Sequence, residues 1–347
     1  MGRLDRRLSV APMMARTDRH CRYLLRLVSV RTLLYSEMIH ANAVLRGDAA
    51  RLLAFDDAEH PVGLQLGGAE PDALARAAEV GQAFGYDEIN LNIGCPSPRV
   101  RKGRFGAALM ATPALVADCA RAMIRAIDVP VTVKCRIGID GRGAYEDLKA
   151  FVETVAAAGV TSFAVHARIA VLDGLSPSEN REIPPLRYDA VYRLKQDLPT
   201  LEVVINGGVA SLDEVDAHLE RVDGAMIGRA AYADPAMLRA ADRHIFGALG
   251  RAEPSRHDIA RAMLPYARRM SSDGVPLHHI TRHMLGLFAG QPGGRVWRRA
   301  LGVGSHRPGA GAEVIEEALT LVPEPALPKR SGLPDAARTM TLARVPG

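Results

Sequence analysis

The segment VVINGGVASLDEVDAHLERVDGAMIGR, residues 203–229, contains a complete strand–helix–strand unit. Its first part, 203–209, is a nearly continuous apolar run, as expected for a parallel strand that is buried on both faces. Residues 211–222 carry apolar side chains at helical spacing, and a second short apolar run follows at 224–229. A strand, a helix and another strand in this order indicate a parallel βαβ unit.

The same pattern extends from this unit to the N-terminus. Further strand-like runs occupy 8–13, 32–38, 62–67, 88–94, 131–137 and 162–168, and helical patterns occupy 71–85, 112–127 and 145–159. Eight strands that alternate with helices predict a closed (β/α)8 TIM barrel. A doubly wound open sheet is the alternative, but APMMART follows the first strand where that fold would favour a G-x-G-x-x-G turn.

The chain divides by composition into three parts. We assign residues 1–247 to the barrel, because residues 247–255 are rich in Gly, Pro and Ser. Residues 256–321 contain helical patterns only, which predicts a small all-helical domain after the barrel. Residues 322–347 are Pro-rich and aperiodic, and we expect a disordered tail there. The long aperiodic connection at 169–188 is predicted to lie on the active-site face.

Composition limits the function classes. The net charge of +5 is a mild basic excess that permits an anionic partner. No apolar run reaches the roughly 18 residues of a membrane span, and the N-terminus lacks a signal peptide's apolar core. The four cysteines form no C-x-x-C pair, so neither a disulfide framework nor a zinc site is indicated. We expect a cytoplasmic protein without a metal.

Polar residues at the strand ends are the candidates for the active site, which lies at that face in barrels of this kind. They are Met13 after Pro12, Gln65, Asn90, Asn92, Cys95, Lys134, Arg136, His166, Arg168, Asn206, Gly207, Gly208, Gly228 and Arg229. Glycines at the last two strands, together with Arg229, predict a phosphate site, because backbone N–H groups can approach a phosphate closely there. The alternative is that these glycines serve tight turns only.

Lys134 and Cys95 are the most reactive candidates. A lysine inside an apolar strand could form a Schiff base, bind an anionic cofactor ring or belong to a structural ion pair. His166 would share the barrel mouth with Lys134 and Gln65. Cys95, between Gly94 and Pro96 just after a strand, is expected on an exposed loop and is our candidate for a reactive thiol. Cys21 and Cys119 fit the role of small core residues.

Several of these motifs resemble the tRNA-dihydrouridine synthases. The similar stretches are APM (11–13), INLNIGCPS (89–97), VTVKCRIGID (131–140), VHAR (165–168), INGGV (205–209) and GR (228–229). LSPSENREIPPL (175–186) and HITRHMLGLFAGQPGGRVWRR (279–299) resemble the A-type subfamily in particular. The similarity runs from about Leu8 to about Leu321.

The resemblance implies an FMN at the barrel mouth, reduced by NADPH, and a tRNA substrate modified in the D-loop around position 20. It places Ala11, Pro12 and Met13 behind the flavin ring and Gln65, Lys134 and His166 against its ring and ribityl chain. It places Asn206, Gly207, Gly208, Gly228 and Arg229 at the FMN phosphate. Cys95 would protonate C5 of uracil after hydride reaches C6.

This chemistry agrees with the residue types. Hydride addition to the C5=C6 bond leaves negative charge on the uracil, which a positioned acid must neutralise. A thiol ordinarily keeps its proton below about pH 8.5. The target base must leave the tRNA stack, so base extrusion is expected.

An RNA-facing region is predicted in the helical part. Residues 274–312 contain no Asp or Glu but carry several arginines, which suits phosphate contacts. A solvated helix face is the alternative. We expect tRNA contacts from Asn92, Ser178, Arg181, Arg295, Arg298 and Arg299, and a monomeric protein.

Some positions depart from the family pattern. Ala15 and Arg16 stand where an acidic–aromatic pair is usual, and Ser178 stands where a lysine is usual; His40 and Asn42 lie in a loop that is usually rich in Thr and Gly. These changes affect the expected docking of tRNA rather than the flavin set. Three rival functions remain at this point: an FMN oxidoreductase acting on a small molecule, a Schiff-base lyase that uses Lys134, and an inactive RNA-binding protein.

Overall fold

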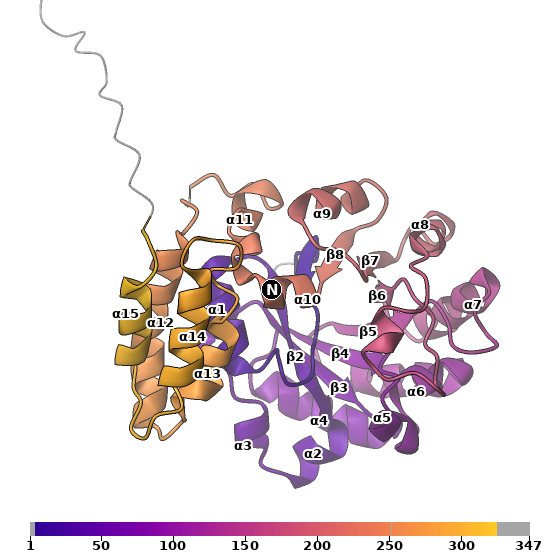
Figure 1. Cartoon of the computed structure of the whole chain (residues 1–347). Helices are drawn as coiled ribbons and strands as arrows, with labels where there is room; N and C mark the ends of the chain where they lie inside the picture. Colours follow the sequence, from indigo (N-terminus) through magenta and orange to yellow (C-terminus); the bar gives the residue numbers. More distant parts are fainter. Residues whose placement is uncertain (1–3, 251, 325–347) are drawn as a thin grey trace, which may run out of the picture.

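A computed structural model describes residues 4–250 and 252–324 of the chain. Eight parallel strands close into a barrel in which each strand pairs with the next and β8 pairs with β1 (Figure 1). The predicted (β/α)8 barrel is therefore confirmed. The strands are β1 (Leu8–Val10), β2 (Leu33–His40), β3 (Val62–Gly67), β4 (Glu88–Ile93), β5 (Val131–Arg136), β6 (Ser162–His166), β7 (Glu202–Asn206) and β8 (Gly224–Ile227).

Helices surround this barrel and include the four that the sequence predicts. The longer ones are α1 (Arg19–Val28), α4 (Pro71–Ala83), α6 (Pro113–Ala126), α7 (Tyr145–Ala156), α8 (Tyr188–Asp197) and α9 (Leu212–Leu219). Thr112 is the N-cap residue of α6 and Pro113 is its first residue, but the Thr112 side chain makes no capping hydrogen bond. Shorter helices are α2 (Ala41–Arg46), α3 (Ala49–Leu52), α5 (Pro98–Lys102), α10 (Arg229–Ala233) and α11 (Ala241–His244).

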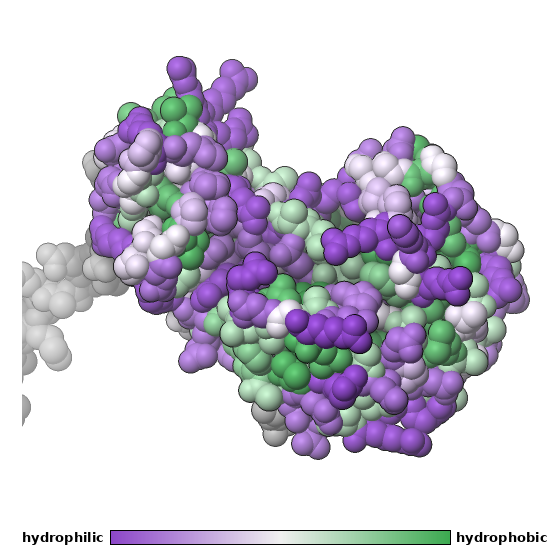
Figure 2. Space-filling view, turned by 90° about the horizontal axis from the view of Figure 1, so that it is seen from below, coloured by the Kyte–Doolittle hydropathy of each residue, from purple (hydrophilic) through white to green (hydrophobic). Residues whose placement is uncertain are grey.

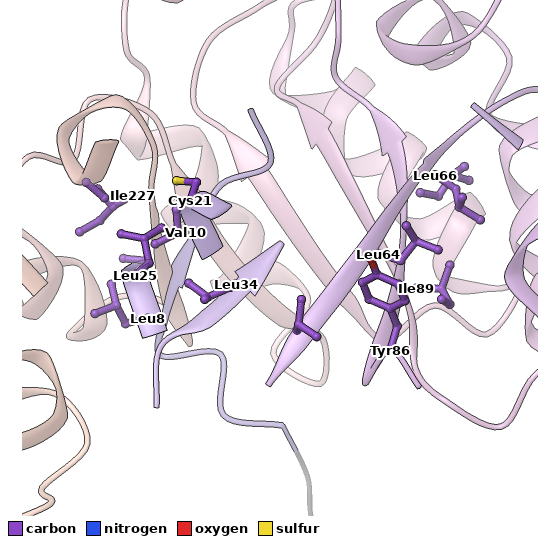
Figure 3. Packing of buried hydrophobic residues seen from close by; sticks show 14 of the residues in the cluster. Leu8, Val10, Cys21, Leu25, Leu34, Leu64, Leu66, Tyr86, Ile89 and Ile227 are labelled. Atoms are coloured by element: carbon purple, nitrogen blue, oxygen red, sulfur yellow. The ribbon is translucent and has the colours of Figure 1, made fainter. Parts of the chain in front are cut away.

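Alternation along the strands separates the core from the barrel interior. In β4, Ile89, Leu91 and Ile93 belong to the large apolar cluster that the strands share with the surrounding helices. Figure 3 shows Ile89 beside Leu64 of β3 and Tyr86 in this layer. The residues between them, Asn90 and Asn92, are buried and polar and face the interior. Elsewhere the interior is partly apolar, because a second small cluster is formed by Ala11, Leu33, Tyr35, Ala164, Val204 and Met226.

The base of the barrel is closed by a buried charge network. Arg6 Nε donates to Glu88 Oε2 at 2.8 Å, and Arg6 Nη1 donates to Glu202 Oε2 at 2.9 Å. Tyr35 Oη donates to the other Glu88 oxygen at 2.6 Å. Because buried charges are tolerated only when paired, this network has a structural explanation at the end of the barrel away from the predicted site.

Four further helices form a bundle beside the barrel. They are α12 (Arg256–Ser272), α13 (Leu277–Met284), α14 (Gly294–Gly304) and α15 (Glu313–Thr320), and they stand next to α1 (Figure 1). Trp297 is fully buried inside the bundle, and its indole N–H donates to the Met284 carbonyl at 2.8 Å. Figure 2 shows the bundle as a lobe that a notch separates from the barrel. Most of the tail predicted at 322–347 lies outside the described residues.

Polar contacts join the bundle to the barrel. Asp18 caps α1 through the N–H groups of His20 and Cys21 and pairs with Arg282 and His283 of α13. His20 Nδ1 lies 2.7 Å from Tyr266 Oη of α12. Burial raises the pKa of Asp18, but the hydrogen bond and charge of His283 outweigh it and hold that pKa well below its usual value. The ion pairs of Asp18 therefore connect the barrel to the bundle.

Within the described residues, no helix is long and apolar enough to cross a membrane.

Candidate active site

The inward-facing residues at the carboxyl ends of the strands converge in one ring. Strand register pairs Asn92 with Lys134, Arg136 with His166, and His166 with Asn206. Every second residue of a strand points to the same face, so these side chains share the barrel mouth. The structure thus brings together the predicted strand-end residues from β3 to β7.

A ladder of side-chain amides links three strands below the mouth. Asn92 Nδ2 donates to Gln65 Oε1 at 2.7 Å, and Gln65 Nε2 donates to Asn90 Oδ1 at 2.8 Å. Asn90 Nδ2 continues to Thr132 Oγ1 at 2.8 Å. Since each amide both donates and accepts, the ladder fixes which end of every amide faces which neighbour.

Asn92 also holds the Cys95 loop. Its Oδ1 accepts hydrogen bonds from the backbone N–H groups of Gly94 and Cys95 at 3.1 and 3.0 Å. The Cys95 carbonyl accepts from Ala107 N–H at 3.0 Å. Gly106 is required beside it, because its φ is +67° and a Cβ there would lie 2.7 Å from the Cys95 oxygen. The loop is therefore fixed from both sides.

Cys95 differs from the other cysteines in its exposure. It is partly exposed, whereas Cys21, Cys119 and Cys135 are buried, and all of them are free thiols. Three cationic side chains interact electrostatically with Cys95, namely Lys134, Arg136 and Arg181. Cys95 is thus the one partly exposed thiol among the described cysteines, and its role as a reactive thiol stays a prediction.

Lys134 is held by an amide and not by a carboxylate. Its Nζ donates to Asn206 Oδ1 at 3.0 Å, and Asn206 Nδ2 donates to the Met226 carbonyl at 2.7 Å. Burial, reinforced by Arg136, lowers the pKa of Lys134 to about 8. In the described part of the chain no acidic partner is seen for Lys134, so the structural ion pair considered from the sequence has no support.

His166 is buried as a neutral ring. Burial lowers its pKa well below the usual value, and the nearby charges of Arg136 and Lys134 act in the same direction. Gly207, directly after β7, has φ +111°, and a Cβ there would lie 2.5 Å from His166 Cδ2. Gly208 also has a positive φ of +77°. Positive φ and close packing thus require glycine at 207 and 208, and this requirement leaves their backbone N–H groups able to bind a ligand.

Gly228 has no such explanation. Its φ is negative, and the nearest atoms to an added Cβ would be Ala11 Cβ at 3.7 Å and Met13 Sδ at 3.9 Å. Ala11 N–H donates to the Ile227 carbonyl at 2.8 Å, which joins the 11–13 turn to the end of β8. Met13 N–H donates a hydrogen bond to Thr17 Oγ1 at 2.9 Å. The turn containing Pro12 and Met13 therefore borders Gly228, as the phosphate-and-flavin assignment requires.

Arginines at the strand ends anchor the 169–187 connection over the mouth. Arg136 donates to the carbonyls of Gly94, Ile169 and Asn180 at 3.1, 2.9 and 2.9 Å. Arg229 pairs with Glu182 at 2.6 Å and donates to the Arg181 carbonyl at 3.2 Å. Arg136 is among the predicted strand-end residues, but the sequence alone assigns it no role. The signal for its role is its position on β5, two residues after Lys134 and therefore on the same face of the strand.

The predicted tRNA residues fall in two places. Asn92 and Arg181 lie at the mouth, and burial together with Arg229 and Arg16 lowers the pKa of Arg181. Ser178 is exposed on the anchored loop. Arg295, Arg298 and Arg299 are exposed on α14 of the bundle. The structure therefore places a positive mouth and a basic helix on different lobes.

Comparison with known proteins gives consistent matches over this whole arrangement. The sequence profile of the dihydrouridine synthase family (Dus) matches residues 9–322. The tRNA-dihydrouridine(20/20a) synthase of Xanthomonas campestris is 56% identical over 312 residues, which cover 90% of this chain and 92% of that protein. Its namesake in Escherichia coli K12 is 55% identical over 318 residues, covering 91% of each. The namesake in Vibrio cholerae is 53% identical and covers 91% and 97%.

Among solved structures, a 2-naphthoyl-CoA reductase in complex with 2-naphthoyl-CoA superposes with a TM-score of 0.50 at 12% identity. The match covers 70% of this chain and 50% of that one. At this level of identity the likeness concerns the barrel fold alone.

Proposed function

The chain belongs to the dihydrouridine synthase family, whose members are flavin-dependent oxidoreductases acting on tRNA uridine, and we propose that it reduces uridines 20 and 20a of the D-loop with FMN and NADPH. Membership in this family excludes two of the rival functions, the Schiff-base lyase and the oxidoreductase acting on a small molecule. The proposal for the two positions rests on the names of relatives that are more than half identical over nine-tenths of the chain.

The residues at the mouth fit a flavin mononucleotide. Lys134 offers a positive charge with one neutral partner, and His166 is a neutral ring beside it, able to donate one hydrogen bond. Ala11, Pro12 and Met13 form a largely apolar turn next to Gly228, whose missing side chain leaves backbone free to approach a phosphate. Gln65 and Asn206 would bind polar edges of the ring and chain, and Gly207, Gly208 and Arg229 would complete the phosphate site.

When bound, the flavin supplies the hydride that adds to C6 of uracil. The Lys134 ammonium would compensate negative charge at the ring, because a cation in a water-poor site acts more strongly than in bulk water. The amide ladder from Asn92 to Asn90 keeps the floor of the mouth rigid, so that no reorganisation is needed during the reaction.

Cys95 would provide the proton. Hydride at C6 leaves an electron pair shared between C5 and O4 of the uracil, and Cys95 Sγ transfers its proton to C5. The thiolate that remains is stabilised by Lys134, Arg136 and Arg181. The fixed position of this loop, through Asn92 Oδ1, is the observation that carries the proposal.

RNA contacts would come from both lobes. The uridine must be extruded from the stack to reach the mouth, where Arg181, Asn92 and Ser178 would contact it or its neighbours. Arg295, Arg298 and Arg299 would bind phosphates farther along the tRNA. Because the proposed substrate is tRNA, we propose that the protein acts in the cytoplasm. We also propose a monomer, because one chain supplies every residue named here.

The test is reduction of unmodified tRNA by the purified protein, with dihydrouridine mapped by position. The wild type should form it at positions 20 and 20a. Cys95→Ala should accept electrons from NADPH normally but slow tRNA reduction by about 10²–10⁴, the usual contribution of a positioned acid. Cys95→Ser should recover little, because a hydroxyl is a far weaker acid than a thiol.

Stopped-flow measurement separates the two half-reactions. Cys119→Ala, which removes a buried thiol in α6, is the matched control and should keep both rates. If Cys95→Ala slowed reduction by NADPH and left reoxidation by tRNA intact, Cys95 could not be the proton donor. Dihydrouridine at other positions would overturn the assignment of the target.

A further inference from the structure

A second concave site lies on the helical bundle, away from the barrel mouth. It is a pocket of about 500 Å³ between the α12–α13 connection and the α14–α15 connection. Its ionisable lining residues are His278, His306 and Arg307, and no carboxylate lines it. A pocket of this size accommodates a nucleotide unit, and its lining selects for negative charge.

The two histidines of the pocket are stacked on each other. The ring centroids of His278 and His306 lie 4.6 Å apart with 21° between the planes, and the edge of His279 meets His278 at 4.4 Å. Ser271, on the α12 side, has a buried hydroxyl without a hydrogen-bond partner. A buried donor left unpaired costs free energy, so this hydroxyl indicates a polar group that completes the pocket.

Basic groups line the pocket, and two carboxylates of α15 lie close to it. Helix α13 begins at Leu277 with no side-chain cap and no acidic residue in its first turn. Of the neighbouring carboxylates on α15, Glu313 accepts from Gly311 N–H at 2.7 Å, and Glu317 lies 4.0 Å from Arg307. Burial, then His279, His306 and Arg282, lowers the pKa of His278. An anion beside the stacked rings would reverse this shift by stabilising the imidazolium form.

The pocket continues a row of basic residues. Arg295 and Arg299 are four residues apart and lie on one face of α14, and His306 follows in the turn after this helix. Gly302 lies in this row and adds no side chain that would interrupt it. The row therefore leads from two exposed arginines to the pocket.

We propose that this pocket binds a phosphodiester group of the RNA between His278, His306 and Arg307, so that RNA binding takes up a proton on the stacked histidine pair. The inference rests on the proposed function, which makes RNA the substrate. Because the bound phosphate favours the charged rings, affinity should rise as pH falls through the range where histidine titrates, about pH 6.5. Ser271 and Arg307 would donate to the same phosphate.

The test measures binding of unmodified tRNA by fluorescence anisotropy at mildly alkaline and mildly acidic pH. The double variant His278→Gln/His306→Gln should lose most of the gain in affinity that the wild type shows on acidification. At the lower pH, its slope of log affinity against log salt should be smaller by about 0.7–0.9 for each lost phosphate contact. His244→Gln, on the barrel helix α11 and paired with Asp216, is the control and should behave as the wild type.

His306→Glu gives an independent variant at an exposed position. It should weaken tRNA binding more than the Gln variants, because a carboxylate would face the RNA phosphate. Equal affinities and salt slopes for all variants would overturn the proposal, and so would inorganic phosphate that protects His278 and His306 in NMR titrations without competing with tRNA. Dihydrouridine formation is measured separately. A wild-type protein that binds tRNA but forms no dihydrouridine would refute the proposed function, and the proposal for the pocket would still stand.

Discussion

Lys134 lies in the barrel wall with its ammonium held by a neutral amide, so its charge depends on pH near the physiological range. Burial lowers its pKa to about 8, which leaves the ammonium protonated at pH 7 and increasingly neutral above about pH 8. A negatively charged ring bound beside it would raise that value again. The residue is therefore suited to a site where an anion binds.

We expect tRNA reduction to fall as pH rises through about 8 or slightly above, since the neutral amine cannot compensate charge at the flavin. The Lys134→Arg variant should reduce tRNA more slowly, but its rate should not decrease above about pH 8, because a guanidinium stays charged. Lys134→Ala should weaken flavin retention. The pH profiles of the three proteins and their flavin content check this; full flavin occupancy and normal turnover in Lys134→Ala would contradict it.

At the residue scale, the sequence predicts candidates whose residue type already indicates a reactive or binding role. It does not predict roles that depend on partners distant in the sequence. Lys134, His166 and Cys95 could be found because a polar residue at the end of an apolar strand needs an explanation. The role of Arg136 could not, because it binds backbone carbonyls, and one of them belongs to Asn180, 44 residues away. The Arg229–Glu182 pair was hidden for the same reason.

At the scale of elements, the strands and the helices α4, α6, α7 and α9 followed from periodicity, whereas α8 was not predicted and neither was α1. Its residues Arg22 and Arg26 are buried and interrupt the apolar pattern. Arg22 is paired with Glu59 at 2.7 Å, and Arg26 donates to four backbone carbonyls. Such partners come from tertiary structure and leave no local signal. The short helices α2 and α3 depend on caps from His40 and Asp48 rather than on periodicity.

The anchored 169–187 connection supplies a prediction at this scale. Arg136→Ala would leave the carbonyls of Gly94, Ile169 and Asn180 without their donor in a buried place, at a cost of about 1–3 kcal/mol in the free energy of unfolding. Hydrogen exchange should rise first in residues 169–187 and near Cys95. Turnover should fall, because both loops at the mouth lose their common support.

Arg136→Lys should rescue only part of this, since an ammonium cannot reach three carbonyls with the geometry of a guanidinium. Arg121→Ala, which removes a half-exposed arginine paired with Asp118 on α6, is the control and should leave exchange at the mouth unchanged. Uniform exchange across the chain in Arg136→Ala would mean that Arg136 contributes to global stability and does not position the loops.

At the scale of the whole molecule, the contacts at Asp18 set the bundle at a defined place beside the barrel. The pairs of Asp18 with Arg282 and His283, and of His20 with Tyr266, cross between lobes far apart in sequence. A tRNA bound at the mouth and on α14 at once is held by two surfaces in fixed relation. Contacts on α14 should then affect how well tRNA binds and not how electrons reach the flavin.

The last prediction follows from that separation. Arg295→Ala with Arg298→Ala removes two exposed charges from α14, so the KM for tRNA should rise while NADPH oxidation without tRNA keeps its rate. Each lost phosphate contact should lower the salt slope of binding by about 0.7–0.9. Arg76→Ala with Arg125→Ala removes the same charge from the exposed faces of α4 and α6 and controls for net charge. If this control weakens tRNA binding equally, the arginines act through the net charge of the protein and not through direct contacts. An unchanged affinity and salt slope in the α14 variant would show that this helix does not contact the RNA.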